Sequence, residues 1–172
     1  MDLAYCDALR FAIDYERKGE EYYRQAVDKA LNPFAKKALV FLADEEVEHI
    51  RKIEEFNQYM LGISDFDLDA ECAIGLPERV TEFIANAKTG GKPASEADLS
   101  DLAVYDLAMA TEKQGFEMYA SVRDSSNDER LKRFFGFLAE EEVVHHRLLA
   151  ESKKYLEDQS YYFEEAGGWI FG

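Results

Sequence analysis

The stretch FLADEEVEHIR at residues 41–51 recurs as FLAEEEVVHHR at residues 137–147, and this repeat decides the fold of the chain. A second pair of segments, AIDYERKGEEYY at residues 12–23 and AMATEKQGFEMY at residues 108–119, is related by the same offset of 96 positions. Two of the three histidines in the chain occupy equivalent places in the repeat, which chance explains poorly. The sequence therefore predicts two similar halves.

Apolar residues recur every three or four positions through both halves, which is the spacing of one face of an α-helix. Four such stripes predict four long helices, the first over about residues 2–31. The expected ends of the other helices carry capping or stop residues. These are Asn32 with Pro33 before the second helix, Gly62 after it, Ser95 with Asp98 before the third, and Ser126 with Glu129 before the fourth.

Residues 63–97 interrupt the pattern with several glycines and prolines, and carry one short amphipathic segment near residues 80–87. We interpret them as a long crossover that contains a short helix. Two helical hairpins joined in this way form an all-α four-helix bundle, which we expect over residues 1–158. The aromatic-rich residues 159–172 are expected to form an irregular C-terminal tail that either caps the bundle or, as we prefer, is buried in a dimer partner.

Six ionisable side chains occupy stripe positions that are otherwise apolar. They are Glu16, Glu46 and His49 in the first half and Glu112, Glu142 and His145 in the second. A carboxylate buried without a partner costs several kcal/mol, so four that converge require positive charge between them. If each hairpin folds about its predicted turn, all six side chains lie at one level. We therefore expect a metal site; a polar core without metal is the alternative.

Four carboxylates and two imidazoles form a ligand set without sulfur, which favours iron, although manganese or zinc can occupy it. Two divalent cations balance the charge of four carboxylates, so we expect two ions. One Glu from each of two helices plus a Glu-x-x-His from each of the other two is a known dinuclear arrangement. We expect Glu46 and Glu142 to bridge the metals, with Glu16 and His49 on one ion and the remaining pair on the other.

The motifs Glu46-x-x-His49 and Glu142-x-x-His145, together with Glu16 and Glu112, resemble the rubrerythrin-like branch of the ferritin-like di-iron carboxylate superfamily. The resemblance covers about residues 5–157 and implies a ferritin-like bundle that holds two iron ions. Relative to rubrerythrin proper, we expect no rubredoxin-like C-terminal domain, and Gly115 replaces a further glutamate ligand. Val47 stands where the haem-ligating methionine of bacterioferritin would be, so haem is not expected.

Other residues near the expected site have candidate roles. Tyr23 and Tyr119 lie two helical turns beyond Glu16 and Glu112 and are candidates to hydrogen-bond a ligand or to carry an electron. Glu20 is a candidate additional ligand. Gly19 and Gly115 leave space either for an oxidant or for close helix packing. The remaining acidic residues are interpreted as solvated faces.

We expect an oxidoreductase that reduces peroxide or O₂ with electrons from an external electron-transfer protein. The alternatives are a ferroxidase or iron-handling protein and a metal-stabilised bundle without turnover. A net charge of −16 and a pI near 4.6 argue against a nucleic-acid partner. Cys6 and Cys72 are too far apart in sequence for a rubredoxin-type site. The absence of a signal peptide or long apolar run predicts a cytoplasmic protein that does not enter membranes, and we expect a homodimer.

Overall fold

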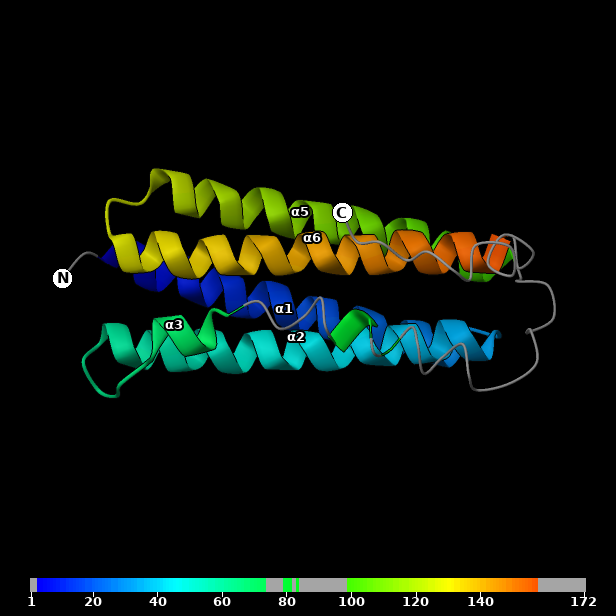
Figure 1. Cartoon of the computed structure of the whole chain (residues 1–172), viewed down its shortest axis with the longest axis horizontal. Coiled ribbons are helices and arrows are strands. Elements are labelled where there is room, and N and C mark those ends of the chain that lie inside the picture. Colours follow the sequence, from blue (N-terminus) through cyan, green and yellow to red (C-terminus); the bar gives the residue numbers. More distant parts are fainter. Residues whose placement is uncertain (1–2, 74–78, 82, 84–98, 158–172) are drawn as a thin grey trace.

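Four long helices, arranged as two hairpins, make up the bundle in the computed structural model, which describes residues 3–73, 79–81, 83 and 99–157. The first hairpin consists of α1 (Leu3–Lys29) and α2 (Pro33–Met60), and the second of α5 (Leu99–Ser125) and α6 (Glu129–Glu157). The two hairpins lie side by side, so that α1 and α5 run antiparallel (Figure 1). The expected all-α bundle is confirmed, and the described residues contain no strand.

The ends of α2 follow the sequence prediction. The Asn32 side-chain oxygen accepts hydrogen bonds from the backbone N–H groups of Phe34 and Ala35 at 2.8 and 3.3 Å, and Pro33 occupies the first helical position. These contacts satisfy donors that a helix start leaves unpaired. At the other end Gly62 adopts a positive φ of 71°, which glycine tolerates best.

The start of α6 differs from the prediction. Asp128, not Ser126, caps the helix, because its side-chain oxygen accepts from the backbone N–H of Arg130 at 2.8 Å. The Ser126 hydroxyl oxygen instead accepts from the backbone N–H of Asp128 at 3.2 Å and tightens the turn. Ser126 and Asp128 are both residue types that cap helices, and only the backbone path of the turn decides between them. The expected Ser95–Asp98 cap lies outside the described residues.

The crossover contains a short helix that the sequence did not indicate, α3 (Leu68–Glu71). Asp67 caps it, accepting from the N–H groups of Asp69 and Ala70 at 3.0 and 3.2 Å. Lys52 of α2 donates to the backbone oxygen of Glu71 at 2.7 Å, which fastens the crossover to the bundle. Of the short helix expected near residues 80–87, residues 79–81 and 83 are helical; the rest of it, and the expected tail, lie outside the described residues.

Two apolar clusters fill the bundle, one toward each end. One gathers around Tyr23, Leu42 and Leu149. The other gathers around Leu9, Phe56 and Phe134, whose two phenyl rings stack at 4.0 Å. On each long helix the candidate metal ligands lie between the residues of these two clusters. The polar site is therefore enclosed by apolar packing along the bundle axis.

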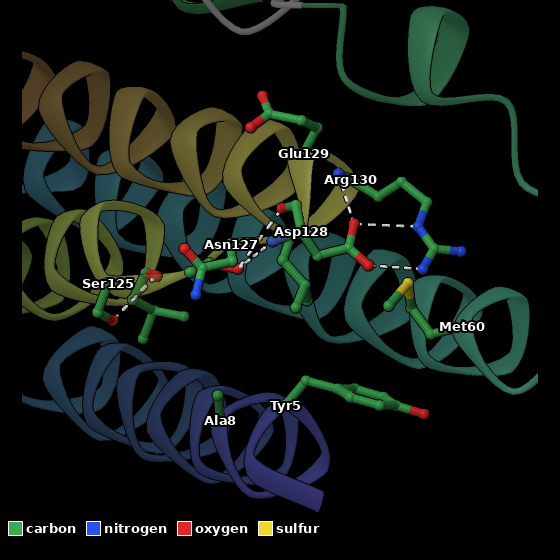
Figure 2. A pocket seen from close by; sticks show the side chains of 11 residues that line it. Tyr5, Ala8, Met60, Ser125, Asn127, Asp128, Glu129 and Arg130 are labelled. Carbon is green, nitrogen blue, oxygen red and sulfur yellow. Dashed lines mark hydrogen bonds and ion pairs between the residues drawn. The ribbon is translucent and has the colours of Figure 1, made fainter. Parts of the chain in front are cut away.

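The bundle also carries an open pocket at the end where α1 begins. It is lined by Tyr5, Met60 and the turn between α5 and α6, and contains none of the candidate ligands (Figure 2). Among the described residues, no helix combines the length and the apolar character needed to cross a membrane.

Candidate metal centre

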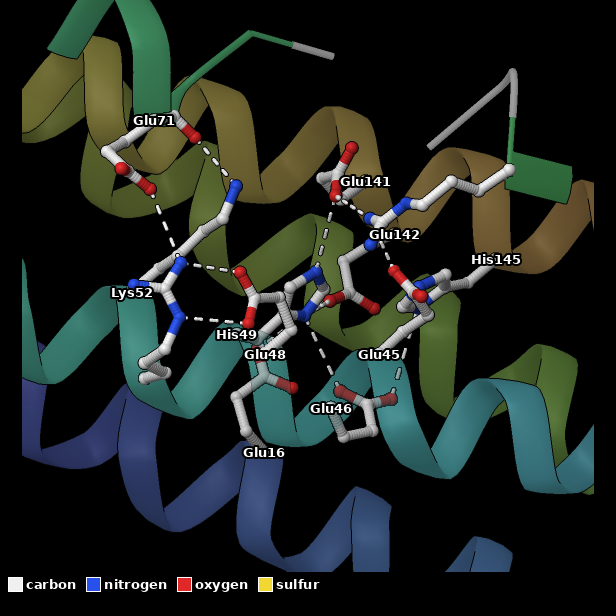
Figure 3. Close-up of polar contacts among 12 residues, drawn as sticks. Glu16, Glu45, Glu46, Glu48, His49, Lys52, Glu71, Glu141, Glu142 and His145 are labelled. Carbon is white, nitrogen blue, oxygen red and sulfur yellow. Dashed lines mark hydrogen bonds and ion pairs between the residues drawn. The ribbon is translucent and has the colours of Figure 1, made fainter. Parts of the chain in front are cut away.

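The six residues predicted as metal ligands converge in the middle of the bundle, and each residue is almost completely buried, with at most 3% of its surface exposed. Glu46, His49, Glu142 and His145 each offer one ligand atom, and these atoms all lie within 4.8 Å of one another. Figure 3 shows five of the six side chains, which point toward a common centre between the helices.

The cluster divides into two halves that share two carboxyl groups. His49 Nδ1 lies 3.5 Å from an oxygen of Glu16, and His145 Nδ1 lies 3.4 Å from an oxygen of Glu112. One oxygen of Glu46 lies 3.5 Å from His49 Nδ1, and its other oxygen lies 4.0 Å from His145 Nδ1. An oxygen of Glu142 lies 3.7 Å from His49 Nδ1. Glu46 thus lies near both histidines, and Glu142 contacts His49 of one half and Glu112 of the other; we call Glu46 and Glu142 the shared carboxyls.

Several buried polar atoms in the cluster have no hydrogen-bond partner among the described residues. They are one oxygen of each shared carboxyl, one oxygen of Glu112, and both ring nitrogens of His49 and of His145. Buried polar atoms are normally satisfied, because an unmade hydrogen bond costs about 1–3 kcal/mol. Oxygen and imidazole nitrogen are donors that iron, manganese and zinc accept. The residues therefore fit a pair of metal ions.

Burial and mutual repulsion make the carboxyl groups hard to ionise together. Burial, with repulsion from Glu16, raises the pKa of Glu46 well above its usual value, and burial with repulsion from Glu112 does the same to Glu142. Burial also raises the pKa of Glu112 to about 7. Without metal, these groups hold protons that balance the charge, and metal ions that bind must displace them.

The two halves differ in their histidines. Burial disfavours the charged form of His49, but the carboxylate of Glu16 outweighs it and raises the pKa of His49 well above its usual value. Burial likewise opposes ionisation of Glu16, but its hydrogen bond with Glu46 and the charge of His49 lower the pKa of Glu16 to about 2. Burial, together with the charge of His49, lowers the pKa of His145 to about 4. In the metal-free protein the positive charge of the cluster is therefore on His49.

The two tyrosines that the sequence singled out hydrogen-bond to candidate ligands, each to the ligand of the opposite half. The Tyr23 hydroxyl on α1 donates to Glu112 on α5, and the Tyr119 hydroxyl on α5 donates to Glu16 on α1. The antiparallel course of α1 and α5 explains the exchange, because two turns along one helix lead to the ligand of the other (Figure 1). Both tyrosines are completely buried.

The two glycines of the repeat face the shared carboxyls. A Cβ atom on Gly19 would lie 3.3 Å from the carboxyl carbon and one oxygen of Glu46, and one on Gly115 would lie 2.9 Å from an oxygen of Glu142. The sequence left open whether these glycines make room for an oxidant or for close helix packing. In the structure these glycines make room for the side chains of the shared carboxyls and, at Gly115, also for the ring of Tyr15, 3.1 Å from the Cβ position.

Two buried acidic residues beside the cluster were missed by the sequence analysis, which assigned the remaining acids to solvated faces. Glu45 and Glu141 are 6% and 2% exposed. Their equivalence in the repeat, immediately before Glu46 and Glu142, was the signal that could have found them. The additional candidate Glu20 lies apart, with its carboxylate partly exposed and 3.5 Å from Arg24.

A bundle with this ligand arrangement belongs to the class of four-helix proteins that hold a dinuclear metal site between carboxylates and histidines. The model of the rubrerythrin family matches residues 7–153, which is most of the chain, and the chain belongs to that family. Comparison with curated proteins and with solved structures gives no match.

Proposed function

We propose that the protein is a non-haem di-iron oxidoreductase that reduces peroxide or O₂ with electrons from an external electron-transfer protein. The observation that carries this proposal is the buried set of four carboxyls and two imidazoles, divided into two halves with shared carboxyls. Two divalent cations neutralise four carboxylates, and a sulfur-free set suits iron, with manganese or zinc as substitutes. The cytoplasmic location and the homodimer expected from the sequence belong to the same proposal.

The side chains have distinct tasks in this proposal. Glu16 and His49 would hold one ion, Glu112 and His145 would hold the other, and the shared carboxyls would supply the remaining oxygen ligands. When bound, two iron ions supply the two electrons that reduction of a peroxide requires. The apolar clusters above and below the site exclude bulk water, which strengthens every electrostatic contact within it.

Tyr23 and Tyr119 orient the two carboxylates that are not shared. At Glu112 the hydroxyl of Tyr23 occupies one oxygen, and the other oxygen lies 3.4 Å from His145 Nδ1. At Glu16 the hydroxyl of Tyr119 donates to the oxygen that lies 3.5 Å from His49 Nδ1. Outer hydrogen bonds of this kind hold a ligand in its productive orientation. They also place an O–H proton beside each half of the site, where reduction of an oxidant consumes protons.

Stopped-flow mixing of the protein, loaded with ferrous iron without oxygen, tests the proposal. We expect the charge-transfer absorbance of the oxidised iron pair to appear faster with hydrogen peroxide than with O₂. Oxidation by peroxide that is no faster than oxidation by O₂ would contradict a peroxidase and favour the ferroxidase alternative. No oxidation by either would leave a metal-stabilised bundle.

A matched pair of variants on α6 links the reaction to the site. Glu142→Ala removes a shared carboxyl and should abolish both retention of two iron ions and rapid oxidation. Glu140→Ala changes an exposed glutamate on the same helix and should leave both unchanged. If both variants retained iron and were oxidised at the same rate, the reaction would not occur at the predicted site.

A further inference from the structure

The two halves of the site are related by the repeat, but two equivalent carboxylates beside the candidate ligands make different contacts. Glu45 on α2 and Glu141 on α6 are equivalent in the repeat, and each precedes a shared carboxyl. Both are buried on the side where α2 and α6 face the crossover (Figure 3). Both lie outside the central group of ligands, on the side of the histidines that faces away from the metal position.

His49 has such a carboxylate behind it. Its Nδ1 atom faces Glu16 and the shared carboxyls, so its Nε2 atom points outward. Nε2 lies 3.7 Å from an oxygen of Glu141, as the dashed line in Figure 3 marks. At 3.7 Å this contact is an ion pair and not a hydrogen bond, but a negative carboxylate beside the outer nitrogen still makes the imidazole of a histidine a stronger ligand.

His145 lacks the corresponding partner. The Nδ1 atom of His145 also faces the cluster, but the ion pairs of His145 with described residues all involve Nδ1, and none involves Nε2. The carboxylate equivalent to Glu141 is Glu45, but no ion pair joins Glu45 to His145 in the described part of the chain. Glu45 is instead engaged by Arg79, whose guanidinium nitrogen lies 2.6 Å from its oxygen.

Arg79 is the source of this asymmetry. It belongs to the crossover, which occurs once in the chain and has no counterpart in the repeat. The same guanidinium nitrogen is 3.9 Å from the Glu141 oxygen that lies 3.7 Å from His49 Nε2, so Arg79 is much closer to Glu45 than to Glu141. An ion pair at 2.6 Å attracts the carboxylate of Glu45 more strongly than a contact at 3.9 Å attracts the carboxylate of Glu141.

We propose that Arg79 is a positioning residue that makes the two metal positions unequal. By holding Glu45 it leaves the His145 imidazole unsupported, while Glu141 supports the imidazole of His49. The position formed by Glu16 and His49 therefore binds the first metal ion, and the position formed by Glu112 and His145 binds the second more weakly. This inference rests on the proposed occupancy of the site by two ions.

Titration of the metal-free protein with Co²⁺ under exclusion of oxygen tests the inference, because the visible spectrum of Co²⁺ reports its coordination. We expect two binding steps whose dissociation constants differ by about tenfold or more, the effect typical of outer partners of metal ligands. In Arg79→Gln, Glu45 is released toward His145, so the two constants should converge. A single step in the wild-type protein, or an undiminished gap in the variant, would overturn the inference.

Three further variants separate this role from a merely structural one. Arg133→Gln removes another arginine that pairs with the crossover, through Asp69, and should preserve the two steps. Glu141→Gln should weaken the first step about tenfold, whereas Glu45→Gln should leave the first step unchanged. If Arg79→Gln does not fold, these two glutamate variants still decide the question, since equal effects on the first step would contradict it.

The outcome is also distinguishable from a failure of the proposed function. A protein that binds two Co²⁺ ions with equal affinity and still oxidises rapidly with peroxide would contradict only the role of Arg79. A protein that binds no Co²⁺ would contradict both.

Discussion

Replacing Gly115 by alanine tests whether the bare face of α5 makes room for a shared carboxyl. A Cβ atom there would lie 2.9 Å from an oxygen of Glu142, 3.1 Å from its carboxyl carbon and 3.1 Å from the ring of Tyr15. At the equivalent Gly19, the nearest atoms, both of Glu46, would be 3.3 Å away. The contact at Gly115 is too short to persist in a close-packed interior, so Glu142 must move.

Two opposing effects set the size of the response. Alanine within a helix is favoured over glycine by about 1 kcal/mol, whereas overpacking typically costs about 1–3 kcal/mol. Without metal, the end of Glu142 can rotate away, so the free energy of unfolding of Gly115→Ala should stay within about 1 kcal/mol of wild type. With metal, rotation removes a ligand contact, and the affinity for the metal pair should fall by about tenfold or more, or about 1.4 kcal/mol.

Urea unfolding of the metal-free protein and Co²⁺ titration measure the two quantities separately. Gly136→Ala is the matched control, because its Cβ would make an ordinary contact of 3.4 Å with Arg123. That control should gain about 1 kcal/mol of stability and bind metal as the wild type does. If Gly115→Ala gained as much stability as Gly136→Ala and kept its metal affinity, the conclusion that the close approach of Glu142 requires a glycine would be wrong.

Three other perturbations have defined outcomes. Tyr23→Phe removes the hydrogen bond to the buried carboxyl of Glu112 and should lower the free energy of unfolding by about 1–3 kcal/mol, measured in urea. Asn32→Ala removes the cap of α2 and should cost about 1 kcal/mol in the same assay. Because the folded-state pKa of Glu112 is raised to about 7, the metal-free protein should lose stability as the pH rises from about 4.5 to 7. The pKa of His145 is lowered from 6.5 to about 4, so this residue alone would make the protein more stable as the pH rises between these two values. It therefore opposes the trend below pH 6.5 and not above it.

Each of these outcomes has a control. Tyr22→Phe removes a half-buried hydroxyl that donates to the backbone oxygen of Val104, and should leave metal binding unchanged. Asp67→Ala removes the cap of the four-residue α3 and should cost less than Asn32→Ala. The pKa values of the shared carboxyls are raised like that of Glu112, so protons should be released when metal binds at neutral pH. Metal-free stability that rises between pH 5 and 7 would contradict the assigned protonation.

The ligand set was predictable because a helix repeats its faces regularly. A polar residue in an apolar stripe must point inward, whatever the rest of the fold does. For this reason Glu16, His49 and their repeat equivalents could be placed in the core from spacing alone. The cap of α2 was predictable on similar grounds, since Asn32 followed by Pro33 combines two local signals.

The predictions that failed concerned choices between neighbouring residues. Ser126 and Asp128 can both cap α6, and the path of the turn selected Asp128. Glu45 and Glu141 are indistinguishable from surface acids by composition. They are buried where α2, α6 and Arg79 of the crossover come together. The spacing of apolar residues along α2 or α6 does not show how these elements pack.

The sequence alone determined that two similar hairpins present four carboxyls and two imidazoles at one level. Helical periodicity and an internal repeat can both be recognised in the order of the residues. Tertiary structure decided which groups meet across the helices. The antiparallel register of α1 and α5 gives each tyrosine the glutamate of the opposite half. The docking of the single crossover brings Arg79 to Glu45 and so distinguishes two halves that the repeat makes alike. Such contacts depend on how separate elements pack, and no local pattern specifies them.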